Sequence, residues 1–309
     1  MQAPFLHSGA TTRHLMQDVL LALAPTCLAS VARHGSSALL LLVATGVSAC
    51  LVNGLLTRRA TPDGSVLITA TVAALMLPAG GPWWLGVVAG AVAIVVGRWA
   101  FGGLGYNLFN PAALSRAWLM AIFPAEMFTW GPRFVDGVSQ ASPLFKPGPA
   151  TAAPSLELLW GGWSCTLAEA APWTVVLGGG YLVARRVADW RIPLTYLLTT
   201  ATMAALLEPG ARMAGHPSWV GTDPLRHVVV GGTLMGAFFL MTDPVTAPFT
   251  PLGRVLGTSL AATLAMLIRF HTHLPDGTAL AVLVANASAP LLDRWALRLR
   301  AETGWRTRP

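Results

Sequence analysis

Residues 36–56 read SSALLLLVATGVSACLVNGLL, a run without a charged side chain. A helix of about 20 mostly apolar residues is long enough to cross the hydrocarbon core of a bilayer. This stretch therefore predicts a membrane-spanning helix. Similar runs recur along the chain, and together they predict ten spans near residues 15–32, 36–56, 65–79, 83–100, 111–130, 171–187, 192–208, 226–241, 254–270 and 277–293.

The composition agrees with a membrane protein. Of the 309 residues, 54% are hydrophobic and only 11% are charged, whereas about a quarter of the residues of a soluble domain are charged. The net charge of +7 comes from basic residues at the ends of the apolar runs, where they suit anionic lipid headgroups and membrane topology rather than nucleic acid. We therefore predict an all-α integral membrane protein with ten transmembrane helices, in which residues 1–309 form a single membrane domain.

Charge also predicts the orientation. Ten spans place both termini on one side of the membrane. With the N-terminus in the cytoplasm, thirteen arginines fall in cytoplasmic segments and six basic residues fall on the opposite side, and short basic loops are typically cytoplasmic. Both termini are therefore expected in the cytoplasm, and the long loop over residues 131–170 is expected outside it.

Two of the ten runs, 65–79 and 226–241, are short or contain glycine and proline. Such a helix is either tilted or broken, and a break is tolerated only where protein or a cavity satisfies the freed backbone groups. Residues 62–65 (PDGS) and 275–278 (PDGT) each introduce an apolar helix. They would lie on opposite membrane faces, as in an inverted repeat, although their positions do not match in a five-plus-five division.

Charged side chains at membrane depth cost roughly 2.5–3.5 kcal/mol each on insertion scales, so they are candidates for function. Those within or at the ends of the spans are Asp18, Arg116, Glu126, Glu169, Glu208, Asp243 and Asp293. Terminal ones can instead reach the interface, which is the simpler interpretation for Asp18, Glu208 and Asp293. Arg116 and Asp243 differ because each lies beside a turn rich in glycine, asparagine or proline.

The first of these turns, FGGLGYNLFNPAA over residues 101–113, joins three glycines to Asn107 and Asn110. Glycines allow close backbone approach to a ligand or a helix, and the two amides can read the edge of a heteroaromatic ring. The alternative is an ordinary turn with a capped helix that begins at the proline. The second turn, MTDPVTA over residues 241–247, holds Asp243 at the end of an apolar helix.

The residues alone leave a transporter, a channel and a redox subunit open. His271 and His273 flank the end of a span and could bind a metal, although solvated histidines at the interface are the simpler interpretation. A nucleotide-binding glycine fingerprint, a Walker sequence and a Cys-x-x-Cys motif are absent from the sequence.

Several longer motifs resemble the RnfD/NqrB family. They are SGATTRHLMQDVLLAL at residues 8–23, TPDGSVLITA at 61–70, FGGLGYNLFNPA at 101–112, MTDPVT at 241–246 and PDGTALAVLVAN at 275–286. The similarity runs along nearly the whole chain in the family's order. NqrB-type chains carry a longer N-terminal extension that this sequence lacks, so RnfD is the closer match.

The resemblance implies a ten-helix fold similar to urea-transporter bundles, with an inverted repeat, that holds a covalent FMN and a non-covalent riboflavin. It implies a subunit of a ferredoxin:NAD oxidoreductase (Rnf) complex in the bacterial inner membrane, which moves Na⁺ or H⁺. The implied partners are RnfA, RnfB, RnfC, RnfE and RnfG, with ferredoxin and NAD reached only through the complex. An NqrB-like subunit of a Na⁺-pumping NADH:quinone reductase, or a cofactor-free transporter of similar fold, are the alternatives.

Asn107 and Asn110 match positions that contact riboflavin in the family, so the resemblance assigns them that role. Arg116 is a candidate cation for the FMN phosphate, as is Arg133. Asp243 is expected to line a central site, with cation passage as one use.

In relatives the FMN is attached to a threonine in a Ser/Thr-Gly-Ala-Thr-like segment of an external loop. Here residues 139–142 read SQAS, so Ser142 stands in the place of the threonine and Ser139 begins the segment. A serine hydroxyl can form the same phosphoester, and loss of the covalent link is the alternative. Thr11 and Thr12 lie in a segment that resembles the attachment motif more closely, but topology places them in the cytoplasm, away from the external transferase.

Overall fold

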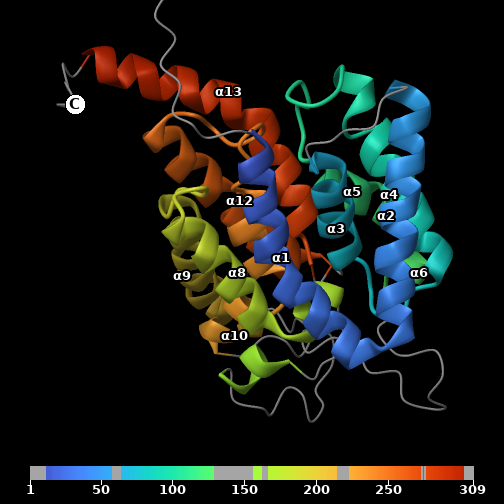
Figure 1. The fold of residues 1–309 in the computed structure, drawn as a ribbon. Helices are drawn as coiled ribbons and strands as arrows, with labels where there is room; N and C mark the ends of the chain where they lie inside the picture. The colour runs from blue at the N-terminus through green and yellow to red at the C-terminus, as the bar shows by residue number, and fades with distance from the viewer. Residues whose placement is uncertain are drawn as a thin grey trace, which may run out of the picture.

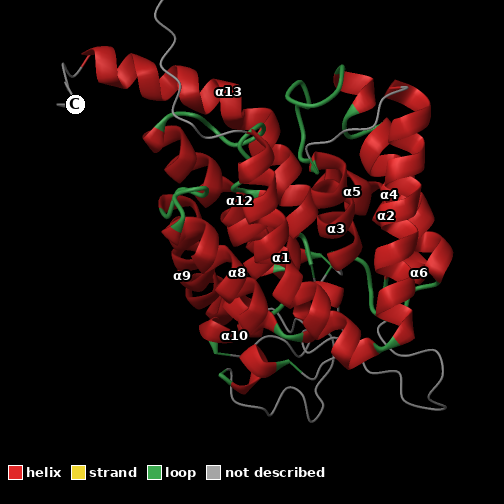
Figure 2. Ribbon diagram, in the orientation of Figure 1, coloured by secondary structure: helices red, strands yellow, loops and turns green. Residues whose placement is uncertain are grey.

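The computed structural model describes residues 12–57, 64–128, 156–161, 166–213, 223–272, 274 and 276–302. These residues form helices joined by short turns (Figures 1 and 2), and their one β-type pairing is an isolated bridge between Pro78 and Thr166. The expected all-helical fold is therefore confirmed.

The helices fall into two sets along the chain. The first set comprises α1 (Thr12–His34), α2 (Ser36–Thr57), α3 (Ser65–Leu75), α4 (Trp83–Val95), the 3₁₀ helix η1 (Trp99–Phe101), α5 (Pro111–Ile122) and α6 (Pro124–Met127). The second set comprises the 3₁₀ helices η2 (Glu157–Trp160) and η3 (Leu167–Ala170), then α8 (Pro172–Ala184), α9 (Arg191–Met213), α10 (Pro224–Val229), α11 (Thr233–Met235), the π-helix η4 (Gly236–Leu240), α12 (Pro251–His271) and α13 (Thr278–Glu302). Much of the expected external loop 131–170 lies outside the described residues, and its described parts include η2 and η3.

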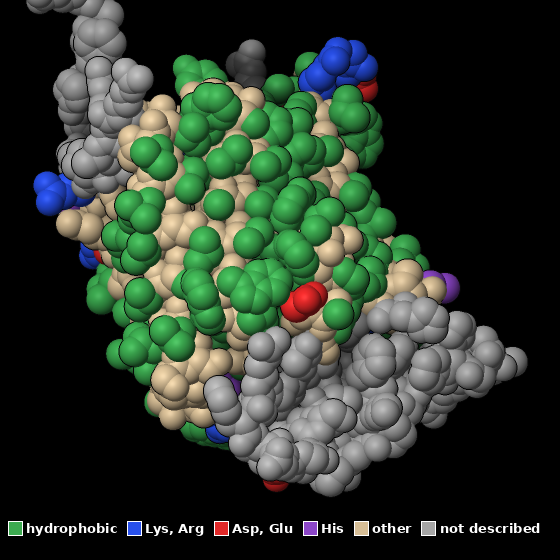
Figure 3. Space-filling model, turned by 90° about the vertical axis from the view of Figure 1, so that its right-hand side faces the viewer, with side chains coloured by type: hydrophobic (Ala, Val, Ile, Leu, Met, Phe, Trp, Pro, Cys, Tyr) green, Lys and Arg blue, Asp and Glu red, His purple; other side chains and the backbone are tan. Residues whose placement is uncertain are grey.

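Five of the described helices are long and apolar enough to cross a membrane: Thr12–His34, Ser36–Thr57, Trp83–Phe101, Pro251–His271 and Thr278–Glu302. Their outer surfaces carry large exposed hydrophobic side chains, such as Leu28 (71% exposed) and Leu55 (79%). Figure 3 shows hydrophobic side chains spread over most of the described surface on one side of the bundle, with lysine and arginine at its margins. Because water would not solvate such a surface, lipid must cover it, and the chain is a multi-pass membrane protein.

Within each set, long helices pack along one another. In the first set α2 packs along α4, and in the second set α9 packs along α12. The sets join where α1 packs on α8 and α5 meets α13. Glycine is required on α8, because a Cβ at Gly178 would collide with the carbonyl of Ala22 on α1 and one at Gly179 with the ring of Phe238.

Both runs that the sequence singles out as short or interrupted are broken helices. Helix α3 ends at Leu75, and the chain then extends to pair with η3, where the Leu167 N–H donates to the Leu77 carbonyl at 3.0 Å. The run 226–241 divides into α10, α11 and η4. Polar partners at both breaks satisfy the backbone groups that the missing helical turns leave free.

Candidate functional site

A cavity lies at the end of the bundle where α1 begins and α8 ends. Its walls come from α1, α3, the end of α4, the turn before α5, the residues after α8, and η4 with the turn that follows it. Its volume is about 120 Å³, counted over the positions that the centre of a water molecule can occupy. A single water molecule occupies roughly 10–15 Å³ as a sphere, so the cavity has room for several waters or for a flat ring system.

Most of the cavity wall is apolar, with side chains such as Ile68, Val72 and Phe239. Its polar lining residues are Ser65, Thr69, Arg98, Asn107, Asn110, Thr242 and Asp243. An apolar cavity with a few convergent polar groups is the usual form of a small-molecule site. Asn107, Asn110 and Asp243, which the sequence predicts as site residues, therefore meet in one place.

Asn107 and Asn110 line the cavity and are each 6% exposed, but their side chains form different numbers of hydrogen bonds. The Asn107 amide donates one hydrogen bond, to the Phe109 carbonyl at 3.1 Å. The Asn110 amide oxygen accepts from the N–H groups of Ala112 (3.0 Å) and Ala113 (3.2 Å), which makes Asn110 the N-cap of α5. Its amide nitrogen also donates to the Leu240 carbonyl at 3.2 Å. Asn110 is thus largely occupied in holding the fold, and Asn107 keeps more of its hydrogen-bonding capacity for a ligand.

Asp243 lies in the turn after η4, and its side chain binds other residues of that turn. Its carboxylate accepts from the Val245 N–H (3.2 Å) and the Thr246 hydroxyl (3.1 Å). Asn286 of α13 ties this turn to the other one, because its amide donates to the Thr246 carbonyl and accepts from the Asn110 N–H at 3.0 Å. The two turns that the sequence singles out are therefore joined through Asn286.

Among the described residues that line the cavity, Arg98 is the one cation. It is 5% exposed, and its guanidinium donates to the Ser65 hydroxyl at 2.9 Å. Its carbonyl accepts from the N–H groups of Phe101 and Gly103, so Arg98 also begins the glycine-rich turn that carries Asn107.

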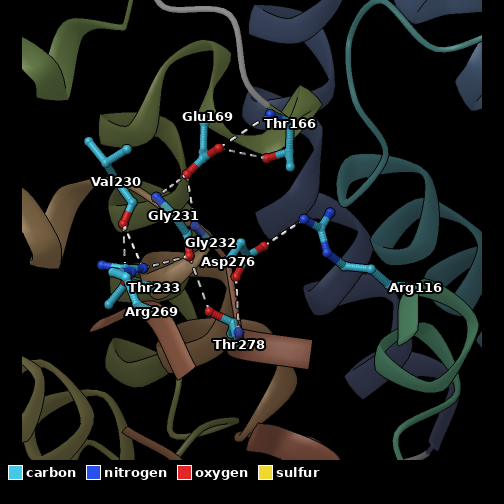
Figure 4. A network of polar contacts seen from close by, with 10 residues as sticks. All are labelled: Arg116, Thr166, Glu169, Val230, Gly231, Gly232, Thr233, Arg269, Asp276 and Thr278. Atoms are coloured by element: carbon cyan, nitrogen blue, oxygen red, sulfur yellow. Dashed lines mark hydrogen bonds and ion pairs between the residues drawn. The ribbon is translucent and has the colours of Figure 1, made fainter. Parts of the chain in front are cut away.

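Arg116 lies elsewhere, in a second polar region between the two sets of helices (Figure 4). Its guanidinium forms an ion pair with Asp276 at 2.6 Å, and the two side chains are 2% and 5% exposed. Arg116 does not line the cavity. Its expected role towards an FMN phosphate stays a prediction, although its charge already has a partner here.

Around Asp276, buried side chains satisfy the backbone at the break between α10 and α11. The Glu169 carboxylate accepts from the N–H groups of Gly231 and Gly232, and also from the N–H and hydroxyl of Thr166. Arg269 donates to the carbonyls at the end of α10, which belong to His227 (3.0 Å), Val230 (3.2 Å) and Gly231 (3.0 Å). Figure 4 shows this break enclosed by the two charged side chains. A left-handed backbone at Gly231 (φ 83°) and Gly232 (φ 72°) makes the break possible.

The simpler interpretation of Asp293, as a side chain reaching the interface, is wrong. Asp293 is 4% exposed, and its carboxylate accepts from the N–H groups of Phe249 (3.0 Å) and Thr250 (2.9 Å) at the start of α12. Asp18 is partly exposed and accepts from the Tyr181 hydroxyl at 2.8 Å. The side chain of Glu208 lies outside the described residues.

Several expected site residues cannot be placed. Ser139, Ser142 and Arg133 lie outside the described residues, as do Thr11 and His273. The described His271 is exposed at the end of α12. Within the described ranges, no three metal-ligating side chains gather at one point.

Comparison with known proteins decides the family. The model of the NQR2, RnfD, RnfE family matches residues 1–300. The chain is 38% identical to the D subunit of the ion-translocating oxidoreductase complex of Sodalis glossinidius over 95% of both chains. It is 33% identical to the D subunit of the Na⁺-translocating ferredoxin:NAD⁺ oxidoreductase complex of Acetobacterium woodii, over 95% of this chain and 92% of that one. The chain belongs to the NQR2, RnfD, RnfE family. The resemblance seen in the sequence is thereby confirmed.

The motifs that resemble this family converge in space. Ser65, Asn107 and Asp243 come from three separate motifs and line one cavity, while Asn286 from a fourth motif supports two of their turns. Sequence reasoning missed Arg98, which precedes the glycine-rich turn by only a few residues. A basic residue at the end of an apolar run is ordinarily assigned to the interface, so its burial against Ser65 could be seen only in three dimensions.

Proposed function

We propose that this chain is the D subunit of an ion-translocating oxidoreductase complex, in which electron transfer between ferredoxin and NAD drives the movement of Na⁺ or H⁺. The observation that carries the proposal is the similarity to relatives of that name over about the full length of both chains. The work of the complex is shared among its subunits, so the chain is not catalytic alone. It supplies a membrane scaffold that positions redox groups.

Riboflavin is the proposed occupant of the cavity. The lining supports this assignment, because apolar side chains such as Ile68 and Phe239 offer walls for a flat ring, and Asn107 offers an amide to its polar edge. When bound, the flavin would accept electrons and pass them on. The residues of this chain would bind and orient the ring and exclude water from it.

A covalent FMN on Ser142 is the second proposed group. Its support is the serine-rich segment 139–142 in the position of the family's attachment loop. Ser139 and Arg116 belong to the same proposal as FMN-binding residues. The expected cation role of Arg116 would require its guanidinium to serve the phosphate as well as Asp276.

Ten membrane crossings arranged as two inverted sets of five, as in urea-transporter bundles, are proposed for the fold. The matched packing of α2 on α4 and of α9 on α12 supports two equivalent sets. Figure 1 shows the start of α1 and the end of α13 at the same end of the bundle, which suits an even number of crossings. With the arginine distribution, we infer that both termini lie in the cytoplasm of a bacterium and the bundle in its inner membrane.

The proposed partners are the other subunits RnfA, RnfB, RnfC, RnfE and RnfG. An NqrB-like role in a Na⁺-pumping NADH:quinone reductase is the second candidate, because the family model covers both kinds of subunit. The electron acceptor separates the two candidates. Membranes containing the complex should reduce NAD with electrons from reduced ferredoxin, and deletion of this chain should abolish that activity. Loss of NADH-dependent quinone reduction instead would favour the NqrB-like role.

The cofactor proposal is tested on the purified chain, produced together with its partner subunits and a flavin transferase. Acid extraction should release riboflavin in about equal amount to protein, identified by chromatography, and a fluorescent band should persist in a denaturing gel. A colourless protein from such a preparation would contradict the flavin proposal and would favour a cofactor-free transporter.

A further inference from the structure

The cavity contains two charged lining residues within the described chain, and they have opposite signs. Arg98 lies between α4 and η1, and Asp243 follows η4. Both charges are fixed in place, Arg98 by the Ser65 hydroxyl and Asp243 by the Val245 N–H and the Thr246 hydroxyl. The Val245 N–H requires the carboxylate oxygen that it meets to accept, whereas the Thr246 hydroxyl can donate or accept.

Backbone groups at two helix N-termini add partial positive charge beside Arg98. Ser65 is the first residue of α3 and Asn110 is the N-cap of α5, so two helix N-termini meet at the same cavity wall as Arg98. Helix N-termini carry partial positive charge. A ring in this cavity would therefore lie beside a buried cation and two positive helix ends, in surroundings that screen charge poorly.

Such surroundings favour one charge state of a redox ring over the other. An oxidised flavin ring is neutral, and uptake of two electrons and one proton leaves one negative charge on it. A fixed positive charge stabilises that anion more than it stabilises the neutral ring, and it does so without reorganising.

We propose that Arg98 raises the reduction potential of the flavin in this cavity by stabilising the negative charge of its reduced form. Asp243 acts in the opposite direction, and the balance between the two sets the potential. The inference rests on the proposed occupancy by riboflavin. It makes Arg98 a residue that tunes the cofactor, in addition to its structural bond with Ser65.

The test is a redox titration, with dithionite as reductant, of the purified complex carrying Arg98→Gln or Arg98→Lys. Loss of the charge in Arg98→Gln should lower the midpoint potential of the riboflavin by about 30 mV or more, which for a two-electron couple corresponds to tenfold weaker relative binding of the reduced form. Arg98→Lys keeps the charge and should keep most of the potential. Arg185→Gln is the matched control, because Arg185 is an exposed arginine outside the cavity lining, and it should leave the potential unchanged.

Direct binding gives a second measurement if a variant loses its riboflavin during purification. Affinities for oxidised and for dithionite-reduced riboflavin should then show that Arg98→Gln weakens the reduced form at least tenfold more than the oxidised form. Equal weakening of both forms would overturn the role of Arg98. So would equal shifts in the Gln and Lys variants.

Asp243→Asn keeps the proposal testable if Arg98→Gln does not fold. Removing the negative charge should raise the potential, and an unchanged or lowered potential would contradict the inference. Absence of riboflavin from the wild-type complex would instead overturn the proposed function, so the two failures are distinguishable.

Discussion

Arg116 on α5 and Asp276 before α13 form a buried ion pair, with 2.6 Å between the guanidinium nitrogen and the carboxylate oxygen. They are far apart in the chain and join the two sets of helices. Asp276 also accepts from the Thr278 N–H at 3.0 Å, and Thr278 donates to the Gly231 carbonyl at 3.1 Å. This ion pair therefore links the junction of the two sets to the broken helix.

Breaking that pair should destabilise the protein. Arg116→Met leaves the Asp276 carboxylate buried without its cation, and loss of one partner of a buried ion pair typically costs about 3–5 kcal/mol. Thermal unfolding of the purified protein in detergent should show a clear fall in the melting temperature. The double variant Arg116→Met/Asp276→Leu removes both charges and should regain part of the loss; a double variant as unstable as the single one would argue against the pair as the cause.

Substitution of the two asparagines of the cavity should have different effects, one on stability and the other on riboflavin binding. Asn110→Ala removes the N-cap of α5, which typically contributes about 0.5–2 kcal/mol, together with the bond to Leu240. It should lower the melting temperature. Asn107→Ala loses one hydrogen bond and should stay near the wild-type melting temperature while retaining less riboflavin, measured as extracted flavin per protein. The reverse pattern would mean that the roles of the two residues are exchanged.

Asp293→Ala should destabilise the start of α12. The Phe249 and Thr250 N–H groups would lose their acceptor at a buried site, and an unsatisfied buried donor costs roughly 1–3 kcal/mol. Faster amide hydrogen exchange confined to residues near 249–253 would confirm the local effect. Glu302→Ala is the control, because Glu302 is exposed at the end of α13, the helix that carries Asp293, and it should leave that exchange unchanged.

The attachment of FMN can be tested by mass. Trypsin cuts poorly before proline, and Pro147 follows Lys146, so digestion should give the peptide of residues 134–185 with an FMN phosphoester on Ser142. Ser142→Ala should abolish the fluorescent band in a denaturing gel. Thr12→Ala should leave the band unchanged. A modified N-terminal peptide would contradict both the attachment site and the proposed cytoplasmic N-terminus.

Acid should weaken the contacts of Asp189, which lies in the segment that connects α8 to α9. Burial alone would raise the pKa of the Asp189 carboxyl, but the Arg191 N–H and the Arg254 guanidinium at 2.7 Å outweigh burial and hold its pKa below the ordinary value of 3.8. A depressed pKa means that this contribution to stability is present above the ordinary value and is lost as pH falls below it. The fall in melting temperature between pH 5 and pH 3 should therefore be smaller in Asp189→Asn than in the wild type. Equal falls would show that the ion pair of Asp189 with Arg254 does not contribute to stability.

Several local features could be predicted from the sequence because they depend on neighbours along the chain. The uncharged run 36–56 is long enough to span a bilayer, and it forms α2 over Ser36–Thr57. The glycine- and proline-containing run 226–241 favours a break, and the chain is broken there. Asn110 before Pro111 predicts a capped helix, and α5 begins there.

The cavity could not be predicted from the sequence, because the residues that line it are far apart along the chain. Asn107 and Asp243 could be chosen one by one as polar residues beside special turns, but nothing in their spacing indicates that they line one cavity. Arg98 and Asp293 each lie at the end of an apolar run, where a charged side chain is ordinarily expected to reach the interface. Their burial depends on which helix packs against them, Ser65 on α3 for Arg98 and the start of α12 for Asp293.

By itself the sequence determined that this is a helical membrane protein, because the length and apolar character of each run must match the thickness of the bilayer. It also determined the turns, since glycine, asparagine and proline restrict the backbone locally. The tertiary structure alone decided that Arg116 meets Asp276 and that Arg98, Asn107 and Asp243 enclose one cavity. Such meetings follow from helix packing between distant segments, where the burial of a charge is tolerated only if another segment brings its partner.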